Sequence, residues 1–259
     1  MALDPLEYWR RPPESRPWVL GHRGLSTHAP ENTLGAFDRA LAAGADGVEL
    51  DVRLSRDAQV VVVHDRTLTR ITLGARTEPV AKLSMAELGA VTLPNGERLS
   101  SLAEVLAWAD HHACRVNVEL KQEGDDPSRL VRAVADVVGS SEHPEHLLFS
   151  SFDTTTVCEL ARTLDVRSPQ SPYAIAWLTE HATDHEPTLS LLSEHAIRAI
   201  HPKHVLLSAD VMQALRQRFA LINTWTVNQP ESVIRLANLG IDTIITDDPA
   251  SALQALADA

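Results

Sequence analysis

The sequence has 259 residues, of which 44% are hydrophobic and 22% are charged. These fractions are normal for a soluble globular protein and exclude a disordered chain, a coiled coil and a fibrous repeat. Lysine and arginine number 23 against 35 aspartate and glutamate residues, which gives a formal net charge of −12. A surface of this charge repels polyanions, so we expect no nucleic-acid partner; an anionic small molecule remains compatible with a site that gathers positive charge.

Short apolar runs typical of strands alternate with longer helical patterns along the chain. Strands are predicted over residues 18–21, 47–54, 115–120, 146–150, 174–178, 197–200, 221–227 and 243–246. A further apolar run at 60–63 is either a continuation of the second strand or its hairpin partner. A helical pattern follows each strand, with Asp153 as a good N-cap and Gly44 and Gly240 as helix ends.

Eight strand–helix units imply parallel pairing with right-handed crossovers. Because a (β/α)₈ barrel typically has about 250 residues, we predict a closed TIM barrel rather than an open doubly wound sheet. The chain is interpreted as a single domain, 1–259, with an N-terminal arm at 1–17. Residues from about 65 to 100 are rich in turn signals and are interpreted as an insertion after the second strand.

The two cysteines, Cys114 and Cys158, exclude a disulfide scaffold and are expected to be buried thiols. The N-terminal arm has no apolar core of signal-peptide length, and no run of about 18 apolar residues occurs. We therefore expect a cytoplasmic location and no stable membrane insertion. The sequence does not indicate the oligomeric state.

Acidic side chains interrupt two of the predicted strands. Glu49 and Asp51 alternate with apolar residues, and Glu119 and Lys121 do the same in the third strand. Since the outer face of a barrel strand packs on helices, these polar side chains should point toward the barrel axis. Three converging carboxylates suit a hard divalent ion, Mg²⁺ or Ca²⁺. The alternative is a buried salt-bridge network with Lys121 and Arg53.

Two histidines follow strand ends, where the active sites of barrels lie. His22 follows the first strand, and His64 follows four consecutive valines. A histidine pair can supply a general base and a general acid near neutral pH, whereas a lone histidine is more often only packed. Arg23 and Lys121 add positive charge beside the acids, so the set of residues suits a phosphate ester.

With these residues assembled, the sequence resembles the glycerophosphodiester phosphodiesterase family over nearly all of the chain beyond the arm. The motifs that carry the resemblance are His22-Arg23-Gly24, Pro30-Glu31-Asn32-Thr33, Gly44-Ala45-Asp46-Gly47-Val48-Glu49-Leu50-Asp51-Val52, His64-Asp65, Glu119-Leu120-Lys121, Ser151-Phe152, Trp225-Thr226-Val227-Asn228 and Thr246-Asp247-Asp248-Pro249. The sequence departs from the family pattern at Ser55-Arg56-Asp57-Ala58 and at Ser100-Ser101-Leu102, which affects the shape of the insertion.

The resemblance implies a TIM barrel with a small insertion after the second strand. It also implies a role for each candidate residue: Glu49, Asp51 and Glu119 as metal ligands, His22 and His64 as the acid–base pair, Arg23 and Lys121 as phosphate contacts, and Phe152 and Trp225 as pocket walls. The expected reaction is metal-dependent hydrolysis of a glycerophosphodiester to sn-glycerol 3-phosphate and an alcohol. Which histidine is the base, and whether water or the glycerol 2-hydroxyl attacks, stays open.

Two other functions fit part of the pattern. A lysophospholipase D-like or sphingomyelinase D-like enzyme would act on lipid phosphodiesters and should present an exposed apolar rim; an aromatic content of 4% argues against it. A non-catalytic barrel that binds glycerophosphodiesters would have no need of both histidines and all three acids.

Overall fold

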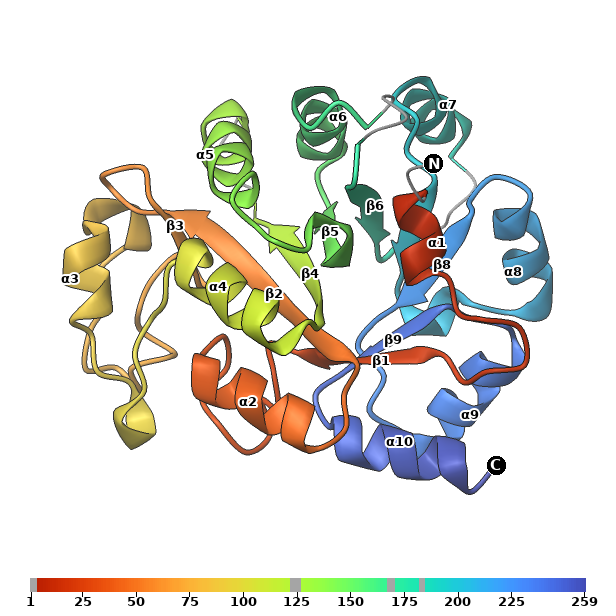
Figure 1. Cartoon of the computed structure of the whole chain (residues 1–259), viewed down its shortest axis with the longest axis horizontal. Helices are drawn as coiled ribbons and strands as arrows, with labels where there is room; N and C mark the ends of the chain where they lie inside the picture. The colour runs from red at the N-terminus through yellow and green to blue at the C-terminus, as the bar shows by residue number, and fades with distance from the viewer. Residues whose placement is uncertain (1–3, 122–126, 167–170, 182–184) are drawn as a thin grey trace.

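Parallel strands close into a barrel in the computed structural model, which describes residues 4–121, 127–166, 171–181 and 185–259. Strand β1 pairs with β2 on one side and with β9 on the other, and every pairing between neighbouring barrel strands is parallel. This closure confirms the predicted TIM barrel (Figure 1). Its strands are β1 (Trp18–His22), β2 (Gly47–Leu54), β4 (Arg115–Leu120), β5 (Leu147–Ser151), β6 (Ala174–Thr179), β7 (Ala199–Pro202), β8 (Leu221–Thr224) and β9 (Thr243–Thr246).

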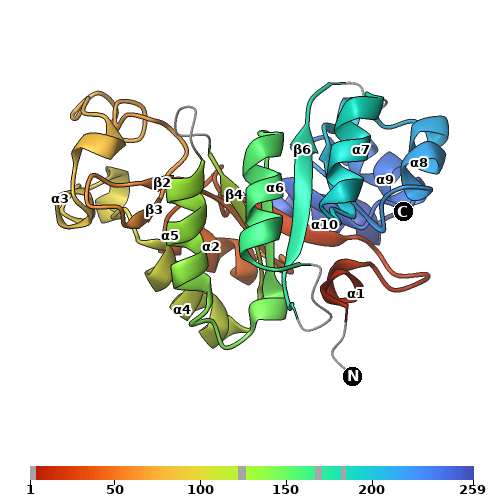
Figure 2. The same ribbon diagram turned by 90° about the horizontal axis from the view of Figure 1, so that it is seen from above.

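Helices alternate with the barrel strands along the chain and cover the outside of the sheet (Figures 1 and 2). Side chains at the helix starts accept backbone N–H groups, as Thr33 does before α2 and Asp153 before α6. These helices are α2 (Leu34–Ala42), α4 (Leu102–His112), α5 (Ser128–Val138), α6 (Thr154–Thr163), α7 (Glu186–Glu194), α8 (Ala209–Arg216), α9 (Pro230–Asn238) and α10 (Pro249–Ala257). No helix among the described residues is long and apolar enough to cross a membrane.

Alternation along the strands divides the interior into two layers. In β2, Val48, Leu50 and Val52 join the large apolar core between the strands and the helices. Glu49 and Asp51, between them, face the barrel axis and are also buried. The alternation therefore removes both carboxylates from water and leaves them dependent on other side chains for stabilisation.

The N-terminal arm contains a short helix, α1 (Pro5–Trp9), which the sequence analysis did not predict. Leu6 and Trp9 of α1 pack against Leu20, Leu148 and Leu221, which form the apolar part of the barrel interior. The arm thus covers one end of the barrel, seen below the strands in Figure 2. Both cysteines are free and buried, as expected.

The segment after β2 leaves the barrel and forms a small subdomain beside it (Figure 1). Strand β3 (Val60–Val62) is antiparallel to β2, which makes it the hairpin partner and not a continuation. It is followed by the 3-10 helix η1 (Val80–Lys82), the helix α3 (Met85–Gly89) and the 3-10 helix η2 (Pro94–Gly96). A separate apolar cluster holds this subdomain together; its buried residues are Val61, Val63, Leu68, Val80, Leu88, Val91, Leu93 and Leu99.

One predicted strand is too long. The strand expected over 221–227 ends at Thr224, and the chain then leaves the sheet, although Val227 remains buried and bonds to Ile245. Beyond Thr224, the indole Nε1 of Trp225 donates to the carbonyl of His201 at 2.9 Å. Trp225 keeps an isolated parallel bridge to Lys203, and Asn228 lies beyond the strand, where its side chain bonds to Asp247.

Candidate active site

The three predicted metal ligands lie together at the carboxyl ends of two neighbouring strands. Parallel pairing places Asp51 of β2 directly beside Glu119 of β4. Glu49 lies two residues before Asp51 and therefore on the same face of the strand. One carboxylate oxygen from each of the three lies within 4.8 Å of the others. All three side chains are buried, with 3%, 0% and 7% of the surface of Glu49, Asp51 and Glu119 exposed.

Two cations and an amide hold this acid cluster. The Lys121 Nζ lies 2.8 Å from Asp51 Oδ1 and 2.5 Å from Glu119 Oε1. The Arg23 Nε lies 3.1 Å from Asp51 Oδ2. The Asn32 Nδ2 donates to the same oxygen at 2.9 Å, and its Oδ1 accepts from the backbone N–H of Asp51 at 3.2 Å. Asp51 is therefore fixed from three sides.

The backbone around Arg23 brings its N–H to the cluster as well. Arg23 and Asn32 both have φ near +60°, in the left-handed region that residues other than glycine adopt infrequently. The Arg23 N–H donates to both the carbonyl and the side chain of Glu49. Gly24 allows α2 to pack this closely, since a Cβ there would lie 2.6 Å from the carbonyl carbon of Ala36.

Two of the three acids have raised pKa values, so the two cations at the cluster do not offset the burial and mutual repulsion of all three carboxylates. Burial raises the pKa of Glu49 far above its usual range, and repulsion from Asp51 and Glu119 raises it further. Burial likewise raises the pKa of Glu119. For Asp51, burial alone would raise the pKa, but the charges of Lys121 and Arg23 outweigh it and lower the value. An added cation beside Glu49 and Glu119 would stabilise their ionised forms.

His22 faces this cluster and is held by an acid from the other end of the chain. Its Nδ1 lies 2.6 Å from Asp247 Oδ1, and its Nε2 lies 3.9 Å from Glu49 Oε2. Asp247 follows β9 and also accepts hydrogen bonds from Ser26 and Asn228. Burial would raise the pKa of Asp247, but these hydrogen bonds and the charge of His22 lower it. The carboxylate thus fixes the imidazole with Nε2 toward the acids.

His64 is held in the same way by its neighbour. Its Nδ1 lies 2.6 Å from Asp65 Oδ1, and Asp65 in turn pairs with Arg70 at 2.7 Å. Burial lowers the pKa of His64, and although the Asp51 charge and the Asp65 hydrogen bond oppose this, the net shift is downward. The imidazole is therefore neutral near pH 7.

A series of ion pairs connects the residue that holds His64 to Arg23 at the acid cluster. Glu31 pairs with Arg70 at 2.6 Å and with Arg23 at 3.1 Å. The series runs from Asp65 through Arg70 and Glu31 to Arg23, and so to Asp51. Because Arg70 lies in the subdomain, this series couples the subdomain to the barrel mouth.

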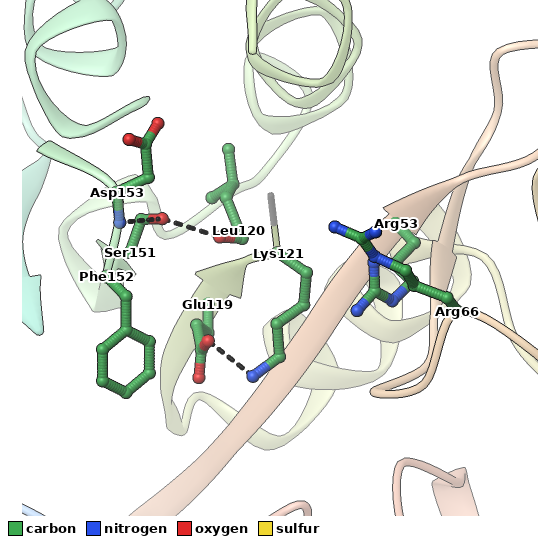
Figure 3. Close-up of a pocket in the computed structure, with 8 residues that line it drawn as sticks. All are labelled: Arg53, Arg66, Glu119, Leu120, Lys121, Ser151, Phe152 and Asp153. Carbon is green, nitrogen blue, oxygen red and sulfur yellow. Dashed lines mark hydrogen bonds and ion pairs between the residues drawn. The ribbon is translucent and has the colours of Figure 1, made fainter. Parts of the chain in front are cut away.

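A pocket of about 400 Å³ opens beside Glu119 and Lys121 (Figure 3). Phe152 stands on one side of it, and Arg53 and Arg66 lie on the other. Phe152 lines this pocket, and its ring meets the Trp225 ring edge to face with the centroids 5.2 Å apart. Arg53 donates from Nε to the carbonyl of His64 and so supports the segment that carries this histidine.

The structure thus brings all nine predicted site residues to the same end of the barrel. Sequence reasoning gave no role to Asn32, Asp65 or Asp247, which hold Asp51, His64 and His22. Asp65 directly follows His64 in the sequence, so the contact between their side chains could have been predicted. The contact between His22 and Asp247 joins residues 225 positions apart and has no local signal.

Comparison with known proteins identifies the family and the fold of this chain. The sequence pattern described as the glycerophosphoryl diester phosphodiesterase family matches residues 22–251. A glycerophosphodiester phosphodiesterase from Caldanaerobacter subterraneus subsp. tengcongensis is 30% identical over 242 residues, covering 89% of this chain and 94% of that protein. A crystal structure of a putative glycerophosphoryl diester phosphodiesterase from Silicibacter pomeroyi superposes with a TM-score of 0.86 at 25% identity, covering 99% and 98% of the two chains.

A second solved structure resembles the fold. It is a phosphodiesterase from Oleispira antarctica in complex with the product sn-glycerol-3-phosphate, and it has a TM-score of 0.80 at 24% identity. The match covers 94% of this chain and 98% of that one.

Proposed function

Because the chain belongs to the glycerophosphoryl diester phosphodiesterase family, we propose that it hydrolyses glycerophosphodiesters to sn-glycerol 3-phosphate and an alcohol in a reaction that requires a divalent metal ion. The observation that carries this proposal is the acid cluster of Glu49, Asp51 and Glu119 with an acid-held histidine beside it. The product bound to the Oleispira protein has the chemistry that such a site would release.

The acid cluster has the composition of a hard-metal site. Its donors are all carboxylate oxygens, which suit Mg²⁺ or Ca²⁺ better than ions that prefer nitrogen or sulfur. The raised pKa values of Glu49 and Glu119 fit a site that is completed by a cation. A divalent ion bound there would act as a Lewis acid on the phosphoryl oxygens.

The two histidines are proposed as base and acid. His64 is neutral near pH 7, so its imidazole can accept the proton of the attacking hydroxyl. His22 then takes the role of the acid that protonates the leaving alkoxide. Asp65 and Asp247 hold the Nδ1 sides, which leaves each Nε2 for proton transfer.

The cationic and aromatic side chains are proposed to bind the substrate. Arg23 and Lys121 lie at the acid cluster and are placed to neutralise the phosphodiester anion and the charge that develops in its transition state. Burial would lower the pKa of Lys121, but the charges of Asp51 and Glu119 raise it, so the ammonium stays charged. Phe152 and Trp225 would line the pocket of the glycerol or the alcohol.

A coupled assay for released glycerol 3-phosphate tests this function directly. The panel contains the choline, ethanolamine, glycerol and inositol diesters and lysophosphatidylcholine, each with EDTA, Mg²⁺ or Ca²⁺. We expect release from at least one water-soluble diester with metal and none with EDTA. Turnover of lysophosphatidylcholine alone would favour the lipid enzyme, and binding without turnover would favour the non-catalytic barrel.

A further inference from the structure

One polar side chain lies beside Glu49 at the inner end of the acid cluster without a hydrogen-bond partner. Asn117 of β4 faces the barrel axis two residues before Glu119, and strand pairing places it beside Glu49. Only 1% of its surface is exposed. Neither its Oδ1 nor its Nδ2 has a hydrogen-bond partner among the described residues. A buried amide in this state is costly, by about 1–3 kcal/mol for an unsatisfied group.

Asn117 lines a small cavity beside the candidate metal ligands, which extends to Trp225, Leu178 and Ile245. The cavity has a volume of about 20 Å³ and is also lined by His22, Glu49 and Glu119. This volume accommodates one water molecule, and a buried water requires two to four polar partners. Asn117 offers both donors and an acceptor here, and the carboxylates of Glu49 and Glu119 offer further acceptors.

We propose that Asn117 is a positioning residue, which binds an internal water molecule and through it orients the carboxylates of Glu49 and Glu119 for the metal ion. The Asn117 Nδ2–H donates to the water, and the water donates to a carboxylate oxygen. The inference rests on the proposed function in one respect, since it takes the acid cluster to be the metal site. Outer hydrogen-bond partners of this kind hold metal ligands in place.

The barrel interior provides a matched control. Thr243 of β9 is fully buried, and its Oγ1 also has no partner within the described part of the chain. It lies opposite Trp18 and Asn223 in the sheet, two residues before Ile245, and it does not border the cavity. Asn117→Leu and Thr243→Val both remove an unpartnered buried polar group, but only the first removes it from the cavity beside the acids.

Calorimetric titration of the metal-free protein with Mn²⁺ alone tests the proposal without substrate. We expect Asn117→Leu to bind Mn²⁺ about 10- to 100-fold more weakly than the unmodified protein, the range seen when such partners are lost. Thr243→Val should bind within about twofold of the unmodified protein. The melting temperature of Asn117→Leu should not fall, because an apolar group of similar shape replaces a polar one. Asn117→Ser, which keeps one donor, should recover part of the affinity.

Two results would overturn the inference and leave the proposed function standing. In the first, the unmodified protein is catalytically active and Asn117→Leu binds Mn²⁺ with an affinity within twofold of it. In the second, Thr243→Val loses as much Mn²⁺ affinity as Asn117→Leu does. If the unmodified protein neither binds Mn²⁺ nor hydrolyses a glycerophosphodiester, both proposals are wrong. Should Asn117→Leu not fold, a high-resolution crystal structure of the unmodified protein decides the matter: a water must bridge Asn117 to Glu49 or Glu119, and its absence refutes the proposal.

Discussion

Replacing Asp247 with asparagine tests how His22 is held in the site. The Asp247 carboxylate accepts from His22 at 2.6 Å through Oδ1 and from Asn228 at 2.6 Å through Oδ2. An asparagine carries an NH₂ group on one of these two sides. If the new NH₂ group faces Asn228, two amide donors meet. If it faces His22, it donates to Nδ1, and the imidazole proton must then lie on Nε2.

The size of the effect follows from the hydrogen bond that is lost. A hydrogen bond to a charged group contributes about 1.5–3 kcal/mol. If this is lost in the transition state, kcat falls about ten- to a hundredfold, since about 1.36 kcal/mol corresponds to a factor of ten. The KM should change little, because Asp247 acts on the imidazole and not on the substrate.

The assay is the coupled release of glycerol 3-phosphate, with Ser26→Ala as the matched control. Ser26 donates to the same Asp247 oxygen at 3.2 Å, but its removal leaves the carboxylate in place. We expect a change below about threefold in kcat for Ser26→Ala. If Asp247→Asn keeps kcat within threefold of the unmodified enzyme, or if the two variants behave alike, the carboxylate does not orient His22.

The other predictions address the acid–base pair, the metal and the pH dependence. His22→Ala and His64→Ala should each lower kcat by at least about 10²-fold, the lower end for general acid–base catalysis, and near-normal turnover would refute the role concerned. Glu49→Gln should remove Mn²⁺ binding in calorimetry together with activity, and unchanged binding would place the ion elsewhere. Because the base must be neutral and burial lowers the pKa of His64, the acid limb of kcat/KM should lie below the usual histidine value of about 6.5. The Asp65 hydrogen bond opposes that shift, so Asp65→Asn should move the limb to still lower pH.

The barrel and the inward acids could be predicted because both leave a periodic signal. The alternation of Val48, Leu50 and Val52 with Glu49 and Asp51 indicates one strand with a polar inner face. Parallel pairing then requires the carboxyl ends of neighbouring strands to meet, which brings Asp51 beside Glu119.

Other features were missed because they depend on tertiary contacts. Helix α1 has only five residues, too few for a periodic pattern, and it is stabilised by Trp9 inside the barrel end. The strand expected over 221–227 was too long because Val227 is buried without being paired in a strand. The pairing of His22 with Asp247 depends on closure of the barrel between β1 and β9.

The main alternative to a metal site is a buried salt-bridge network in which side-chain cations alone neutralise the acids. Lys121 already pairs with Asp51 and Glu119, and Arg23 already pairs with Asp51. These two cations do not neutralise Glu49, whose pKa stays raised by burial and by the neighbouring acids. The two accounts therefore differ in whether a divalent ion joins the cluster.

A crystal structure with Mn²⁺ and glycerol 3-phosphate, with the ion located by its anomalous signal, tests this difference most directly. The metal-site account predicts one strong peak in contact with carboxylate oxygens of Glu49, Asp51 and Glu119, and a phosphate between His22 and His64. A phosphate bound there by Arg23 and Lys121 with no Mn²⁺ among the three acids would contradict it.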